Sequence, residues 1–285
     1  VAYYEIDWDG DGNSNGTTNS NFIPWDGYSS CNTRFRAVDN LGNRGAWTGA
    51  NHIHMDTTKP SMSVELYTTS KGYYPKVSLS DSNLDTLQII KDGLNYSNSF
   101  NSTSYTESIK NVELGNGTYT FIVKDKAGNS TSKVVRIQMI LTQNNYGGWN
   151  SNYYYSSFGN IPDHSYGTQS GFLLWGIGSS HSGFGALATY YKNNVNTTNY
   201  DIITAVYYLG SGTSNGMSFG MQLNGTALGS FDSATSKNSG NLICMYRDIS
   251  NYNSNYTVVL RASGGTSDTL QSYIMCSGMY SIRDN

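Results

Sequence analysis

A short motif occurs twice, and this repeat constrains the fold more than any other feature of the sequence. Residues 35–43 read FRAVDNLGN and residues 121–129 read FIVKDKAGN, so both contain Phe-x-x-x-Asp-x-x-Gly-Asn. Gly and Asn tolerate a positive φ in a turn, and an Asp side chain accepts backbone N–H groups across it. Each copy therefore predicts a β-hairpin whose Asp is structural, and the interval between the copies fits one small β-sandwich.

The composition predicts an all-β chain. It has 31 Gly and 24 Tyr against 9 Phe and 4 Pro, and it is rich in Asn, Ser and Thr, which suits short strands joined by tight turns. The 285 residues are enough for two or three domain cores. Aromatic residues make up 13% of the chain and occur in every segment, which excludes a disordered chain.

Charge and hydropathy exclude two kinds of partner. The formal net charge is −3 and no segment concentrates Lys or Arg, so we expect no nucleic acid partner. No apolar run of about 18 residues occurs, so we expect no direct membrane insertion. The N-terminus lacks the pattern of a signal peptide, and we expect a mature or trimmed chain.

The three cysteines do not define the compartment. Cys31, Cys244 and Cys276 are too few for a disulfide framework and lack the spacing of a metal site. A Cys244–Cys276 disulfide within one domain and two free thiols are both open at this point. We expect Cys31 to be a small buried apolar residue.

Residues 56–60 (DTTKP) separate the two copies of the motif, and Pro60 favours extended geometry and interrupts strand pairing there. The combination of VDNLGN or VKDKAGN with a following DTTKP resembles tandem bacterial immunoglobulin-like domains of cell-surface and phage structural proteins. The resemblance covers the first half of the chain and implies immunoglobulin-like β-sandwiches in tandem that serve as spacers, stalks or adhesive modules. We expect a partial immunoglobulin-like domain over residues 1–57 and a second domain over residues 58–140.

The first of these domains is too short for a complete sandwich. Either the chain was cut within a domain, or another chain supplies the missing strand by β-augmentation. In the second domain we predict strands at residues 61–67, 76–79, 87–91, 108–114, 118–124 and 133–139. The dipeptide Asn116-Gly117 predicts a hairpin between the fourth and fifth of these strands.

Residues 141–285 form a different module, because charged residues thin out there and the repeat does not recur. We predict a jelly-roll-like β-sandwich with strands at residues 171–176, 185–191, 202–209, 218–223, 242–246, 257–262, 272–275 and 280–282. Segments such as DIITAVYYLGSG and YTVVLRASGG resemble the lectin-like jelly rolls of carbohydrate-binding modules and phage tail tips. That resemblance implies a binding domain.

One segment has the spacing of a calcium loop. Asp7, Asp9 and Asp11 alternate and Gly12 follows, so three carboxylates can converge on one calcium ion while the glycine allows a sharp turn. Thr18 replaces the bidentate Glu at position twelve, and the flanking residues look like strands, so an EF-hand is not expected. The alternative is an acidic, solvated hairpin loop.

The candidate ligand site is an aromatic-rich polar segment at the start of the third module. Aromatic faces pack on pyranose rings while amides and charged groups bind the hydroxyls. Antibody-like protein recognition and simple packing in a core or subunit contact are the alternatives. The residues of this candidate site are Tyr146, Trp149, Tyr153, Tyr154, Tyr155 and Phe158.

We predict no catalytic residues. Residues 212–216 (GTSNG) match G-x-S-x-G but lie in a turn between β segments, not at a strand-to-helix elbow. His52 and His54 lack a third zinc ligand nearby. The module from residue 141 contains no Glu, so the paired carboxylates of a glycosidase are hard to find.

These features together favour a non-catalytic, extracellular, adhesin-like surface protein that binds a glycan or a host surface protein through the C-terminal loops. The first alternative is a phage virion component, such as a tail fibre, receptor-binding or decoration protein, assembled as a homo-oligomer. The second alternative is the non-catalytic part of a larger glycan-degrading enzyme. We expect the chain to lie outside the cell, on a cell surface or a virion surface.

Overall fold

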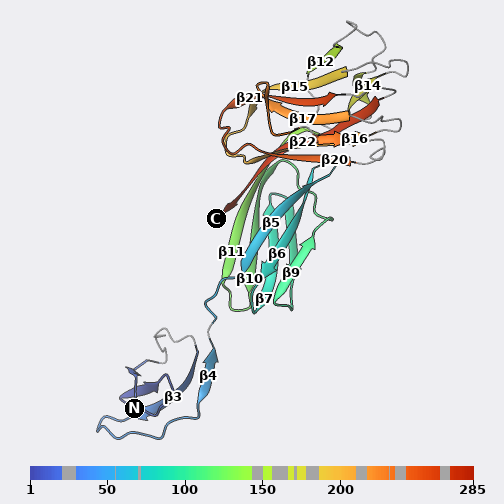
Figure 1. Cartoon of the computed structure of the whole chain (residues 1–285). Coiled ribbons are helices and arrows are strands. Elements are labelled where there is room, and N and C mark those ends of the chain that lie inside the picture. The colour runs from blue at the N-terminus through green and yellow to red at the C-terminus, as the bar shows by residue number, and fades with distance from the viewer. Residues whose placement is uncertain are drawn as a thin grey trace.

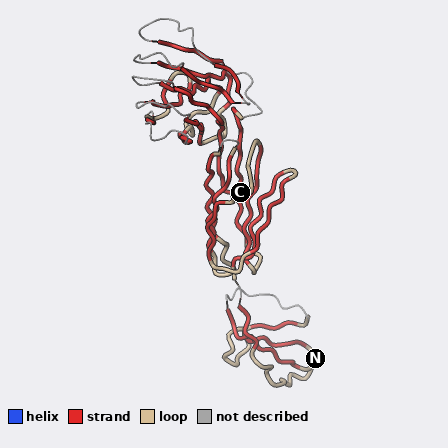
Figure 2. The backbone as a smooth tube through the Cα atoms, turned by 90° about the vertical axis from the view of Figure 1, so that its right-hand side faces the viewer, coloured by secondary structure: helices blue, strands red, loops and turns tan. Residues whose placement is uncertain are grey.

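The computed structural model describes residues 1–20, 30–54, 56–69, 72–142, 150–155, 166–169, 172–177, 186–209, 217–230, 232–234, 242–263 and 270–285. All regular structure in these ranges is β-strand, and every strand pairing is antiparallel (Figure 2). The prediction of an all-β fold is therefore confirmed. The described part of the chain contains no helix suited to crossing a membrane.

The N-terminal unit, residues 1–54, contains one four-stranded sheet in the order β2-β1-β3-β4. Its strands are β1 (Tyr3–Asp7), β2 (Gly16–Thr18), β3 (Ser30–Val38) and β4 (Asn51–His54). Ile6, Trp8 and Cys31 are buried together in a small core. Cys31 is 5% exposed, as its predicted apolar role requires.

The middle unit, residues 56–141, is a sandwich of two sheets. One sheet contains β5 (Ser61–Thr68), β6 (Tyr73–Ser80) and β9 (Ser104–Ser108). The other contains β8 (Leu94–Ser99), β7 (Leu84–Lys91), β10 (Gly117–Asp125) and β11 (Ser130–Leu141). In β5, buried and exposed residues alternate strictly, which places every second side chain in the core between the sheets.

The turns of the repeated motif form as predicted. Oδ1 of Asp39 accepts the N–H of Asn43 at 2.9 Å, and Oδ1 of Asp125 accepts the N–H of Asn129 at 2.8 Å. The glycines of the two turns have φ of 85° and 94°, a region that residues with a Cβ rarely adopt. Both Asp residues are thus parts of the fold.

The predicted strand at residues 108–114 and the hairpin at Asn116-Gly117 are wrong. Strand β9 ends at Ser108, and β10 begins at Gly117 in the opposite sheet, where it pairs with β7 and β11. Between them the chain crosses the end of the sandwich with Ile109, Val112 and Leu114 buried in the core. Their apolar spacing reflects this crossing and not a strand.

The C-terminal unit, residues 142–285, also has two layers. A six-stranded sheet contains β12 (Asn150–Tyr155), β15 (Ala186–Asn196), β21 (Asn255–Ser263), β17 (Met217–Leu223), β18 (Thr226–Ala227) and β19 (Asp232–Ala234). The second layer contains β13 (Tyr166–Gln169), β14 (Phe172–Ile177), β22 (Leu270–Asp284), β16 (Ile202–Leu209) and β20 (Leu242–Asp248).

Strand β22 joins the middle and C-terminal units into one nine-stranded sheet. Its first part, from Leu270 to Ile274, pairs with β14, and its last part, from Ser277 to Asp284, pairs with β11. Strand β16 runs along its other edge. The C-terminal end of the chain consequently lies beside β11, far from the top of its own unit (Figure 1).

Cys244 and Cys276 do not form the disulfide that the sequence left open. Both are free thiols. Cys244 of β20 and Cys276 of β22 are both paired with Val206 of β16, so β16 lies between them. Strands β20 and β22 are therefore two strand spacings apart, about 9–10 Å, which is too far for an S–S bond between them.

Candidate functional site

A groove with several tyrosines lies where the middle unit meets the C-terminal unit. It runs between β5, which is an edge strand, and the strands β20 and β22, and it encloses about 560 Å³. We call it the tyrosine groove. It is lined by Val64, Glu65, Leu66, Tyr67, Thr68, Tyr74, Cys244, Tyr246, Tyr280 and Ile282.

Tyr67 and Tyr74 form a stacked aromatic pair in this groove, which we call the tyrosine platform. They are directly opposite each other on β5 and β6, and strand alternation places both on the outer face of the sheet. Their ring centroids are 5.6 Å apart and the ring planes differ by 16°. Tyr67 is 37% exposed, so a ligand can reach the ring.

Polar groups lie at the edge of this platform. The Tyr67 hydroxyl donates to Oε2 of Glu65 at 3.1 Å, and the Lys76 ammonium is 3.5 Å from the same oxygen. The negative charge of Glu65 raises the pKa of Lys76, and the ammonium lies 5.9 Å from the Tyr67 ring centroid. The platform therefore has a hydrogen-bond acceptor and a donor beside it.

The opposite wall is held in place by hydrogen bonds and packing across the junction. The Tyr246 oxygen accepts the N–H of Thr68 at 2.8 Å and lies 2.9 Å from its hydroxyl. Burial raises the pKa of Tyr246, and burial also raises the pKa of Tyr280 to about 12. Both phenols stay neutral at physiological pH and can act as hydrogen-bond donors.

The chemistry available in the tyrosine groove is that of binding. Among the described residues that line it, the one carboxylate is that of Glu65. Hydrolysis of a glycosidic bond uses a pair of carboxyl groups that flank the scissile bond. Aromatic faces, neutral hydroxyls and one carboxylate instead match the apolar faces and the hydroxyl groups of a sugar.

The described part of the aromatic segment predicted from the sequence, residues 150–155, does not line this groove. Tyr146, Trp149 and Phe158 are outside the described residues. Residues 153–155 belong to β12, the edge strand that pairs with β15, and only their backbone is described. In Figure 1 this strand is at the far end of the C-terminal unit, so the loop site stays a prediction.

The predicted calcium loop brings its three carboxylates together. Asp7, Asp9 and Asp11 place one oxygen each within 4.8 Å of the others. Asp7 is fully buried and accepts the N–H groups of Gly10 at 2.6 Å and Gly12 at 2.9 Å. Hydrogen bonds from residue 13 lower the pKa of Asp11, which keeps that carboxylate ionised. In this loop, these three residues could hold calcium.

The flanks of this loop are the strands β1 and β2, as the sequence indicated. Thr18, at position twelve, lies in β2 and pairs with Tyr4 of β1. Its hydroxyl donates to the carbonyl of Ser20 at 3.4 Å. In a second group, Asp56, Asp81 and Asp125 of the middle unit also place one carboxylate oxygen each within 4.8 Å of the others. No local sequence pattern predicts this group, because the three residues are far apart along the chain.

Comparisons with known proteins find similarity to solved structures only. No family model matches the chain, and no curated protein matches it. A structure described as a carbohydrate-binding module of the β-sandwich superfamily has 11% identity and a TM-score of 0.34, and the match covers 77% of this chain and 97% of that one. A carbohydrate-binding module from Clostridium perfringens, solved with methyl-galactose, has 16% identity and a TM-score of 0.25, with 50% and 86% covered.

A family 43 arabinoxylan arabinofuranohydrolase from Bacillus subtilis has 8% identity and a TM-score of 0.28. That match covers 89% of this chain and 48% of the enzyme. Because these identities and TM-scores are low, we base the function on the residues of this chain.

Proposed function

We propose that the chain is a non-catalytic, extracellular glycan-binding protein and that the tyrosine groove holds the saccharide. The observation that carries the proposal is the near-parallel pair of Tyr67 and Tyr74 beside the carboxylate of Glu65 in an open groove. A pyranose ring can pack on the platform while Glu65 and the neutral phenols bind its hydroxyls. In this proposal the N-terminal unit is an immunoglobulin-like spacer, and the immunoglobulin-like middle unit both supports the C-terminal unit and forms one wall of the groove displayed on a cell or virion surface.

The test is a glycan-array screen of the full chain followed by titration of the best glycan. Tyr67→Ala and Tyr74→Ala remove the platform, and we expect each to weaken binding at least about tenfold, since burying an aromatic ring contributes about 1.5–3 kcal/mol. Tyr4→Ala is the matched control, because Tyr4 is a strand tyrosine with a similar exposure of 41% outside the groove.

Two outcomes would count against the proposal. Unchanged binding by Tyr67→Ala together with loss of binding by Tyr154→Ala would move the site to the aromatic segment around β12. Absence of binding to any glycan by the intact, folded chain would reject glycan recognition altogether.

A protein ligand is the second candidate, and the edge of β5 favours it. Among the described strands β5 pairs with β6 alone, so its other edge faces the tyrosine groove. An extended segment of a host protein could add to that edge as a further strand. A peptide that competes with the glycan, and whose binding survives Tyr67→Ala, would favour this candidate.

A further inference from the structure

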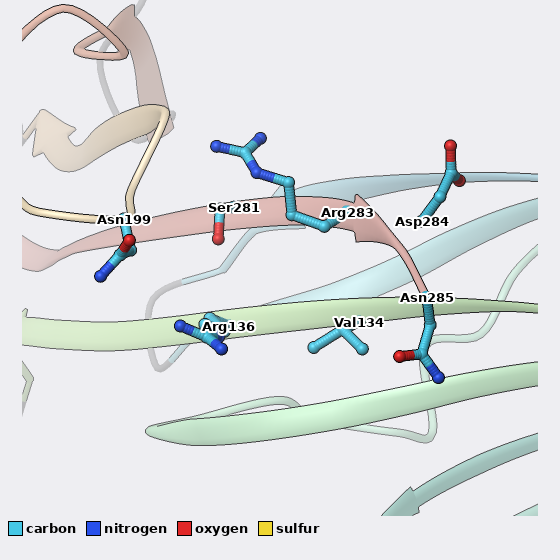
Figure 3. Close-up of a pocket in the computed structure, with 7 residues that line it drawn as sticks. All are labelled: Val134, Arg136, Asn199, Ser281, Arg283, Asp284 and Asn285. Carbon is cyan, nitrogen blue, oxygen red and sulfur yellow. The ribbon is translucent and has the colours of Figure 1, made fainter.

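A second groove lies on the opposite face of β22. On this strand Tyr280 and Ile282 line the tyrosine groove, whereas the alternate residues Ser281 and Arg283 line a separate hollow of about 320 Å³. Arg136 of β11 and Asn199 of the C-terminal unit complete its centre (Figure 3). We call this hollow the arginine groove.

The two arginines of this groove differ in their partners. The Arg283 guanidinium forms a two-pronged ion pair with Asp201, so its charge is already matched, and in Figure 3 it points away from Arg136. Arg136 is exposed, and no hydrogen bond or ion pair from the described residues reaches its guanidinium. It is therefore available to an anion from outside.

Ser281 supplies a second polar group to this hollow. Its side chain is 1% exposed, and its hydroxyl has no hydrogen bond to any described residue although it lines the hollow. A hydroxyl in the wall of a hollow can donate to, or accept from, a group bound there. Figure 3 shows the Ser281 hydroxyl pointing toward Arg136 with Asn199 beside them, so three polar residues line this side of the groove.

We propose that the arginine groove binds the carboxylate or sulfate group of an acidic saccharide. The planar guanidinium of Arg136 can bind such a group through two parallel hydrogen bonds, while Ser281 and Asn199 bind adjacent sugar hydroxyls. A saccharide fits better than an acidic peptide, because Val134 is the one apolar residue among the lining side chains. The inference rests on the proposed function and names a class of ligand for it.

The experiment compares three probes on the full chain by titration calorimetry. These are an oligogalacturonate, which carries carboxylates, a sulfated dextran oligosaccharide, and an uncharged dextran oligosaccharide of matched length. We expect tighter binding of one charged probe than of the neutral one, and the preferred probe tells carboxylate from sulfate. Arg136→Gln should weaken binding of the preferred charged probe about tenfold to a hundredfold, as expected for loss of a charged hydrogen bond.

Lys124→Gln is the matched control for net charge. Lys124 is exposed on β10 of the same sheet and does not line the groove. The Lys124→Gln substitution should leave binding of the charged probe unchanged. Ser281→Ala should weaken that binding less than Arg136→Gln does. Raising the salt concentration should weaken the charged probe and not the neutral one.

Equal binding of charged and neutral probes, or equal effects of Arg136→Gln and Lys124→Gln, would overturn this inference and leave the tyrosine groove intact. Binding of poly-glutamate as tight as that of the oligogalacturonate would also overturn it in favour of an acidic peptide. If the chain binds no saccharide of either kind, both the inference and the proposed function fail.

Discussion

The hydroxyl of Tyr73, in the middle unit, lies 2.6 Å from Oγ1 of Thr204, in the C-terminal unit, and both groups are buried. Because Thr204 donates to the carbonyl of Gly278 at 3.3 Å, the Tyr73 hydroxyl is the donor in this contact. Val206 and Cys276 extend the core of the middle unit across the same junction. The two walls of the tyrosine groove are thus fixed to one packed body.

Gly278 is the position where this junction tolerates no side chain. A Cβ there would lie 2.7 Å from the Tyr73 hydroxyl and 3.0 Å from Sδ of Met139. We expect Gly278→Ala to lower the free energy of unfolding by about 1–3 kcal/mol through overpacking. Tyr73→Phe alone should cost about 1–2 kcal/mol, and the double variant should cost less than the sum, because removal of the hydroxyl relieves the clash.

Urea unfolding of the four proteins in this cycle measures the coupling. Gly115→Ala is the control, since a Cβ at Gly115 meets no atom within 4 Å. Additive losses in the double variant would show that Tyr73 and Gly278 do not interact as the structure places them.

Much of the fold follows from local sequence signals, and the junction does not. The turns at Asp39 and Asp125 were predictable because each Asp accepts a backbone N–H only four residues further along the chain. The pairing of β22 with β11 joins residues more than a hundred positions apart, so no local pattern encodes it. The crossing at Ile109 and Leu114 was misread as a strand because apolar spacing alone does not separate the two structures.

The ion pairs of Glu5 make the stability of the N-terminal unit depend on pH. Burial pushes the pKa of Glu5 up, but the hydrogen bonds and charges of Arg36 and Arg44 outweigh it and hold the pKa below its ordinary value of 4.5. A carboxyl whose pKa is lower in the folded state stabilises that state above the unfolded pKa and loses this effect as pH falls through the folded pKa.

We therefore expect Glu5→Gln to be less stable than the unchanged chain at neutral pH, with the difference shrinking as pH falls below 4.5. Thermal melts of both proteins across that pH range give the measurement. The lowered pKa values of Asp11 and Asp39 affect both proteins alike and cancel in the difference. A difference that stays constant with pH would contradict the role of the ion pairs.

Calcium should stabilise the N-terminal unit if Asp7, Asp9 and Asp11 bind it. A ligand at about a hundred times its dissociation constant adds about 2.7 kcal/mol to the free energy of unfolding. We expect chelation to lower the melting temperature and Asp9→Ala to abolish the response. Asp92→Asn, at an exposed turn in the middle unit, should keep it. A melting temperature that does not change with chelator would contradict the predicted calcium site.

The tyrosine groove was only partly visible in the sequence. Tyr67 and Tyr74 flank a short turn, and correct hairpin register would have paired them on the outer face. Tyr246 and Tyr280 come from β20 and β22, and their arrival opposite β5 depends on the tertiary pairing of the two units. Local alternation shows that a tyrosine faces outward, and it does not show which distant strand lies across from it.

Cys244 gives a chemical probe of the tyrosine groove. It is an exposed thiol in the lining of the groove, whereas Cys31 and Cys276 are buried, and burial raises the pKa of Cys276 to about 12. Iodoacetamide should therefore modify Cys244 alone in the folded chain, since the thiolate is the reactive form and access is needed. We expect modification to weaken glycan binding and a bound glycan to slow modification, both read by intact-mass spectrometry. Cys244→Ser should bind glycan and resist the reagent until the chain is unfolded, and glycan binding that survives full modification of Cys244 would place the saccharide elsewhere.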